Sequence, residues 1–183
     1  MTIYEEIAAD HKKVLGLLGK LVEAEKADSK IRDNLITQIR NELVPHSRAE
    51  EAVLYNSIRD VGSASGVVAH SYQEHMEAEA LLRGLQVTGT VGVNWLAGVM
   101  KLKEALEHHI AEEESKVFGA AKKLFAEEEA VAMADVFNKL KPMIQEQSLV
   151  GTSMDMLANM MPARLRGIFG KFALGNRSDA RAI

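Results

Sequence analysis

The chain has 183 residues, a formal net charge of −4 and a hydrophobic content of 47%. This hydrophobic content is enough for a folded core and argues against disorder, while the slight acidity gives no reason to expect nucleic-acid binding. There is no cysteine, which excludes disulfide scaffolds, thiolate metal sites and thiol catalysis.

Apolar residues recur at helical spacing along most of the chain, which predicts an all-α fold. Thr2 and Glu5 have the spacing of a capping box, and they open a first helix that runs to about Lys26. Three further helices are predicted over about residues 29–60, 66–86 and 94–125. Four helices of similar length with short connections predict an up-down-up-down four-helix bundle.

A shorter fifth helix is predicted from residue 127 to 147, with Pro142 near its end, and it completes a first domain of residues 1–147. Residues 148–183 form a C-terminal extension, Met-rich at first and basic from Arg164 onward. One interpretation is an interaction with a membrane surface or a protein partner. The other is a segment that folds back across the bundle or is partly disordered.

The expected location is the cytoplasm. The N-terminal residues MTIYEEIAADHKK lack the apolar stretch of a signal peptide. Nowhere do 18 consecutive apolar residues occur, so no membrane-spanning helix is predicted.

Each of the four main helices carries one histidine on its apolar face, where residues three, four, seven and eleven apart come together. These histidines are His11, His46, His75 and His109. A glutamate lies one turn after the second and the fourth, at Glu50 and Glu113. Six polar side chains are therefore predicted to point into the bundle.

Two neighbouring histidines, His108 and His109, cannot face the same way because adjacent helical residues point about 100° apart. His109 shares its face with apolar residues such as Leu102 and Leu106, whereas His108 shares its face with charged residues. The periodicity therefore predicts that His109 points inward and His108 outward. His70 is also flanked by polar residues.

Burial of four imidazoles and two carboxylates would cost too much free energy unless something paired them. A cation at the centre of the bundle would do so, and histidine with carboxylate suits iron, manganese or zinc. Six ligands exceed the needs of one tetrahedral zinc ion, so two metal ions bridged by Glu50 and Glu113 are the better interpretation. A metal-free structural bundle is the alternative that this burial cost disfavours.

The arrangement resembles the hemerythrin-like family, also called the HHE cation-binding domain, over about residues 3–124. The motifs are the pair Asp10-His11, HxxxE at residues 46–50, the run Gln73-Glu74-His75, and HxxxE at residues 109–113. The resemblance implies two non-haem iron ions, favoured over manganese or zinc, with a bridging oxo or hydroxo group. It also implies terminal ligands at His11, His46, His75 and His109, and bridging carboxylates at Glu50 and Glu113.

Other helical and hydrolytic metal sites do not fit the spacing. The ferritin-like site needs Glu-x-x-His, but none of the residues three before the inward histidines is glutamate. There is also no His-Glu-x-x-His motif of a zinc protease.

The chain departs from the oxygen-carrying hemerythrins at helix 3. Those proteins have HxxxH there, but the position four before His75 is Ser71. Water, Glu79 or Tyr55 could fill the gap. Tyr55 is nominally across its helix from His46, so it reaches the site only if that helix is distorted, and Pro45 within the helix makes such a distortion credible. Otherwise Tyr55 is a packing or interface residue, and Glu79 accepts a hydrogen bond from a histidine N–H.

Fewer histidines and more oxygen ligands stabilise ferric iron and leave an exchangeable position. We therefore expect redox chemistry with O2, hydrogen peroxide or nitric oxide, in oxidative or nitrosative stress or in iron and oxygen handling, more than reversible oxygen carriage. Two modes of action stay open: turnover of such a ligand as an enzyme, and sensing through a protein partner.

Overall fold

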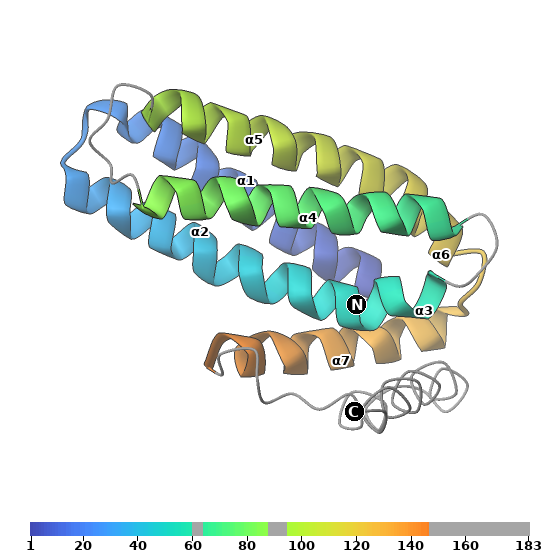
Figure 1. Ribbon diagram of the computed structural model, residues 1–183. Coiled ribbons are helices and arrows are strands. Elements are labelled where there is room, and N and C mark those ends of the chain that lie inside the picture. Colours follow the sequence, from blue (N-terminus) through green and yellow to red (C-terminus); the bar gives the residue numbers. More distant parts are fainter. Residues whose placement is uncertain (60–63, 88–94, 147–183) are drawn as a thin grey trace, which may run out of the picture.

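The computed structural model describes residues 1–59, 64–87 and 95–146 (Figure 1). Within these ranges the chain forms helices and turns and no strand, which confirms the predicted all-α fold. The C-terminal extension predicted at residues 148–183 lies outside the described residues. No helix in the described ranges is both long and apolar enough to cross a membrane.

Four long helical rods form the body of the protein. The first is α1 (Ile3–Glu23), extended by the short 3-10 helix η1 (Ala24–Lys26), and the third is α4 (Ala64–Val87). The second rod joins α2 (Ser29–Glu50), the π-helical segment η2 (Glu51–Tyr55) and α3 (Asn56–Ile58). The fourth joins α5 (Trp95–Glu112), the π-helical segment η3 (Glu113–Val117) and α6 (Phe118–Ala121).

Successive rods run in opposite directions, as the colours of Figure 1 show. Helix α1 packs against α2 and α5, and α4 packs against the same two helices from the other side. A fifth helix, α7 (Glu127–Glu146), lies along α1 and α2 on the outside of the bundle. The prediction of an up-down-up-down four-helix bundle with an additional C-terminal helix is confirmed.

Local capping interactions fix the helix ends. The Thr2–Glu5 capping box opens α1 as predicted, and Asp28 accepts a hydrogen bond from the backbone N–H of Lys30 at the start of α2 (2.8 Å). The prediction that the fourth rod continues to residue 125 was wrong, because it ends at Ala121. The Glu129 carboxylate accepts a hydrogen bond from the backbone N–H of Ala126 (2.9 Å), which caps the start of α7. The chain therefore turns between Ala121 and Ala126.

The apolar core is divided into two clusters. One lies at the end of the bundle that holds the C-terminal halves of α1 and α4 and the N-terminal halves of α2 and α5, around residues such as Leu18, Ile39 and Leu102. The other includes Ile7, Val53 and the α7 residue Phe137. The predicted inward histidines and glutamates come between these two groups along each rod, so both ends of the polar centre are sealed by apolar side chains.

Candidate metal centre

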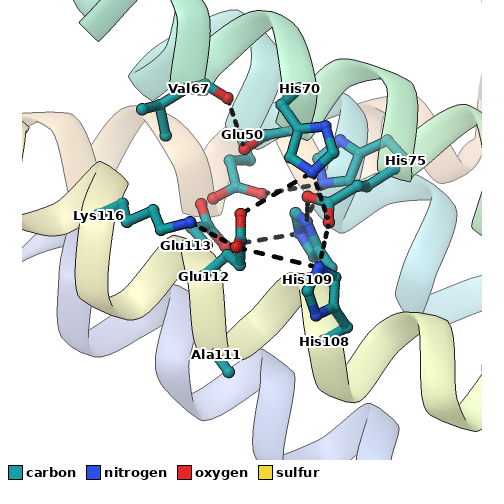
Figure 2. A network of polar contacts seen from close by, with 12 residues as sticks. Glu50, Val67, His70, His75, His108, His109, Ala111, Glu112, Glu113 and Lys116 are labelled. Carbon is teal, nitrogen blue, oxygen red and sulfur yellow. Dashed lines mark hydrogen bonds and ion pairs between the residues drawn. The ribbon is translucent and has the colours of Figure 1, made fainter. Parts of the chain in front are cut away.

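The six predicted inward residues meet in the middle of the bundle, and each is at most 4% exposed. Nε2 of His75 lies 3.1 Å from Nε2 of His109 and 3.4 Å from Oε2 of Glu50. On the other side, Nε2 of His11 lies 3.2 Å from Oε2 of Glu113. Figure 2 shows Glu50 and Glu113 beside one another, with His75 and His109 close by.

These residues form two adjoining groups whose ligand atoms could hold a metal ion. One consists of His11, His109 and Glu113, and the other of Glu50, His75 and His109. His46 extends the second group, since its Nε2 lies 3.6 Å from Oε2 of Glu50. Each glutamate therefore lies between histidines of different helices, which is the arrangement that a bridging carboxylate requires.

A π-helical segment follows each of the two HxxxE motifs. Glu50 is the last residue of α2 before η2, and Glu113 is the first residue of η3. A π turn holds one residue more than an α turn, so it rotates the following side chains around the helix axis. The second helix is therefore distorted as expected, but the distortion begins after Glu50, and Pro45 itself lies within α2.

The rotation brings Tyr55 into the site. Its ring is fully buried and stacks on the His75 imidazole, with ring centroids 5.4 Å apart and an interplanar angle of 20°. Its hydroxyl donates a hydrogen bond to Oε1 of Glu113 (3.2 Å) and also interacts with Ser71, the position that lacks the second histidine of helix 3. Burial and the charges of Glu50 and Glu113 raise the pKa of Tyr55 well above its usual value. Tyr55 is therefore a neutral phenol beside Ser71 and Glu113 in the metal-free chain.

Glu79, the other residue considered for this gap, lies elsewhere. Its carboxylate is 2.8 Å from Nη2 of Arg48 and 3.6 Å from Nη2 of Arg83. The prediction that Glu79 accepts a hydrogen bond from a histidine was wrong, because Arg48 of α2 engages it instead.

Four other acidic residues orient the histidines, and we call them the acid ring: Asp10, Glu51, Glu74 and Glu114. Each accepts a hydrogen bond from Nδ1 of one inward histidine on a neighbouring rod. The pairs are His46–Asp10 (3.2 Å), His75–Glu51 (3.0 Å), His109–Glu74 (3.0 Å) and His11–Glu114 (2.9 Å). An acceptor at Nδ1 fixes the proton there and leaves the Nε2 lone pair free toward the centre.

Basic residues hold two members of the acid ring in place. Lys141 of α7 donates to Oδ2 of Asp10 (2.7 Å), and Arg48 donates to Oε2 of Glu51 (3.0 Å). The sequence interpretation missed the acid ring as a whole. A signal was present, because each of its members is adjacent in sequence to one of the six inward residues.

Asp10→Ala is expected to weaken metal binding by about 10- to 100-fold, because His46 loses the acceptor that fixes its proton on Nδ1. Metal affinity measured by competition with a chromophoric chelator tests this. Asp33→Ala removes an exposed acid from α2 and serves as the matched control. Equal affinities of the two variants would contradict the orienting role of Asp10.

The two central carboxylates cannot both be charged at low cost. Burial and the neighbouring charge of Glu113 raise the pKa of Glu50 well above its usual value. Burial would also raise the pKa of Glu113, but its interactions with Glu50 and His11 outweigh this effect and lower it. In the metal-free chain, Glu50 is thus the protonated member of the pair and Glu113 the ionised one.

Burial and neighbouring charges also shift the pKa values of the histidines in different directions. Burial lowers the pKa of His46 to about 4, although Asp10 opposes this effect. Burial and the neighbouring His75 lower the pKa of His109. Burial alone would lower the pKa of His11, but Glu113 and Glu114 outweigh it and raise the pKa. At neutral pH, His46 and His109 are therefore neutral and able to donate a lone pair.

Several polar atoms at the centre make no hydrogen bond within the described part of the chain. They are both carboxylate oxygens of Glu50, Oε2 of Glu113 and Nε2 of His11. Buried polar atoms are normally paired, and these point at a common centre. Their chemistry, imidazole nitrogen and carboxylate oxygen, fits first-row transition-metal ions such as iron.

A small cavity of about 10 Å³ adjoins this centre. Its lining combines the four inward histidines with the apolar side chains of Val14, Leu43, Leu106 and Ile110. A volume of this size is close to the minimum that one water molecule needs. The space beside the four histidines is therefore about the size of one water molecule.

The family model described as the hemerythrin HHE cation binding domain matches residues 2–121. A protein of Nostoc sp. named DNA nickase is 28% identical over 147 residues, which are 80% of this chain but only 41% of that protein. An uncharacterized hemerythrin-like protein of Schizosaccharomyces pombe is 27% identical over 148 residues, which cover 80% of this chain and 72% of the relative. No solved structure matches the chain significantly.

Proposed function

Because the chain belongs to the hemerythrin HHE cation-binding family, we propose that its bundle holds two iron ions and uses them on a small oxidant. In this proposal His11, His46, His75 and His109 would be terminal ligands of the ions, and the carboxylates of Glu50 and Glu113 would hold both ions. The unpaired polar atoms at the centre support the ligand assignment. The acid ring supports it too, since it turns all four Nε2 atoms inward.

Two iron ions in such a site supply one-electron and two-electron redox steps to a bound ligand. The protein around the ions determines which ligand can bind to them. The cavity beside the histidines admits only a few atoms, which favours O2, hydrogen peroxide or nitric oxide over an organic substrate. Its apolar walls, including Leu43 and Leu106, keep bulk water away from the centre.

Tyr55 is the single observation that favours turnover over reversible oxygen carriage. Its hydroxyl interacts with Ser71, the position at which the resemblance to oxygen carriers implies a further histidine, and it donates to the proposed bridging residue Glu113. A phenol at this place adds an oxygen atom with an O–H donor directed at Glu113, whereas an imidazole would present a nitrogen lone pair to the metal. Proton delivery from a buried donor assists disproportionation of hydrogen peroxide, in which one peroxide molecule is reduced to water while a second is oxidised to O2.

We do not propose a DNA nickase activity, which is the name of the Nostoc relative, for this chain. The match spans less than half of that protein, and the present chain carries a net negative charge. A nucleic-acid partner would normally require a basic surface.

Tyr55→Phe is expected to lower peroxide turnover by about 10- to 100-fold while the iron content stays unchanged, because the variant keeps the stacking on His75 and loses only the hydroxyl. Oxygen release from hydrogen peroxide and consumption of nitric oxide by the iron-loaded protein are the measurements. Tyr4→Phe removes a buried hydroxyl remote from the centre and is the control.

Two results would contradict this proposal. Reaction of the wild-type protein with a single equivalent of peroxide or nitric oxide, without turnover, would favour a sensor that acts through a partner. Full activity of the Tyr55→Phe variant would contradict the proposed role of the Tyr55 hydroxyl as a proton donor.

A further inference from the structure

A second group of metal-ligand side chains lies on the surface of the bundle, on the other side of Glu74 from His109. It consists of His70 and Glu74 of α4 and His108 and Glu112 of α5. On each helix the histidine and the glutamate are four residues apart, so they share a face. One ligand atom from each of the four residues lies within 4.8 Å of the others.

The four side chains converge from two helices. Nε2 of His70 lies 3.4 Å from Oε1 of Glu74 and 3.8 Å from Oε2 of Glu112. Nε2 of His108 lies 3.6 Å from the same Glu74 oxygen and 4.0 Å from Oε1 of Glu112. Figure 2 shows the rings of His70 and His108 directed toward Glu112.

Glu74 provides an independent sign that something is bound here. Its side chain is only 10% exposed, and its Oε1 is buried without a hydrogen bond among the described residues. That oxygen points between the two imidazole nitrogens, while Oε2 accepts the hydrogen bond from His109. A carboxylate oxygen withdrawn from water in this way is costly unless a cation meets it.

We propose that His70, Glu74, His108 and Glu112 bind one divalent first-row transition-metal ion at the protein surface, separately from the inner centre. Two imidazoles exclude a preference for calcium or magnesium and favour ions such as Zn²⁺ or Fe²⁺. The histidine side chains are 51% and 62% exposed, so an ion can reach them directly from solvent.

The required adjustment is small. Ligand atoms around a tetrahedral zinc ion lie about 3.3 Å apart, since each Zn–N or Zn–O bond is about 2.0–2.1 Å long. The His70–Glu74 separation of 3.4 Å is already near this value. The other three histidine–glutamate distances, 3.6–4.0 Å, can shorten by rotation of the exposed histidine side chains. Lys116 forms an ion pair with Glu112, and the metal ion would displace it.

Glu74 connects the two sites. One of its oxygens would bind the outer ion while the other still holds Nδ1 of His109. The outer ion would therefore stand one carboxylate and one imidazole away from the inner centre. Binding of the outer ion needs none of the proposed inner chemistry, so the two proposals can fail independently.

The test compares zinc binding by purified full-length wild-type protein and the His70→Ala/His108→Ala double variant, under identical conditions, by equilibrium dialysis against Zn²⁺. The wild type is expected to bind one zinc ion per chain more than the double variant. The control is Glu77→Ala/Glu104→Ala, which removes one acid from each of the same two helices outside the proposed site, and it should bind as the wild type does.

Iron content and circular dichroism complete the experiment. The double variant should keep the iron content and helicity of the wild type, whereas Glu113→Gln should lose iron and keep the additional zinc ion. Equal zinc binding by the wild type and the double variant would overturn the outer site. Loss of iron from the folded double variant would overturn its separation from the inner centre.

Discussion

Glu113→Ala is expected to lower the metal affinity of the protein by at least 100-fold, more than the roughly 10- to 100-fold loss typical for a residue that only supports a ligand. Glu113 lies between His11 and His109 and is completely buried. Its removal deletes the negative charge that the two histidines share and leaves the Tyr55 hydroxyl without its acceptor. The measurement is iron content after purification without chelator, together with the near-ultraviolet absorption of the oxidised protein.

His109→Ala and His108→Ala form the matched pair for this prediction. His109 is buried and belongs to both inner groups, whereas His108 is exposed. The His109 variant should lose the absorption bands, and the His108 variant should keep them. The reverse outcome would show that the inner centre is wrongly placed.

Glu50→Gln is expected to have opposite effects on the metal-free and the iron-loaded protein. Without metal, removal of an ionisable group from this buried site should stabilise the fold at pH 8 by about 1–3 kcal/mol. With iron, the variant should be less stable than the wild type, because an amide is a poor replacement for a bridging carboxylate. Urea unfolding of chelator-stripped and iron-loaded protein measures both effects.

The pH dependence identifies Glu50 as the cause. Its pKa is raised above the ordinary value of 4.5, so in the folded metal-free chain Glu50 retains a proton that the unfolded chain has lost. The resulting contribution to stability is fully present below pH 4.5 and decreases as the pH rises through the folded-state pKa. The Gln variant lacks this decrease. Contributions from His46 and Glu113 occur in both proteins, so parallel stability curves for the two proteins between pH 5 and 8 would contradict the prediction.

The helices and the inward residues could be predicted because both follow from a 3.6-residue period. His109 and His108 show this most clearly, since the apolar neighbours of one and the charged neighbours of the other decide which is buried. The same reasoning places Glu50 and Glu113 inside, one turn after their histidines.

The π segments could not be predicted in this way, because they break the period on which the prediction relies. A regular helix directs Tyr55 away from His46, and only the additional residue of η2 turns it inward. Proline is a cause of helix distortion that a sequence displays, so Pro45 could indicate a distorted second helix but not the position of the π segment.

The partners of polar residues were predicted least well, because they depend on contacts between helices. Glu79 lies on a buried face as expected. Its partner is Arg48 of another rod, and not a histidine. His70 and His108 each look like ordinary solvated residues on their own helix. They form a group only because α4 and α5 lie side by side.

The four hydrogen bonds of the acid ring run the same way around the bundle, from each rod to the next. Asp10 and Glu74 immediately precede an inward residue, whereas Glu51 and Glu114 immediately follow one, on rods that run in the opposite direction. Reversal of a helix reverses the sense in which consecutive side chains turn about it, so this alternation sends all four acids the same way around the bundle. A bundle of the opposite hand would bury the same apolar residues but direct each acid to the wrong neighbouring helix. The pairing of acids with histidines is thus compatible with only one of the two mirror-related topologies.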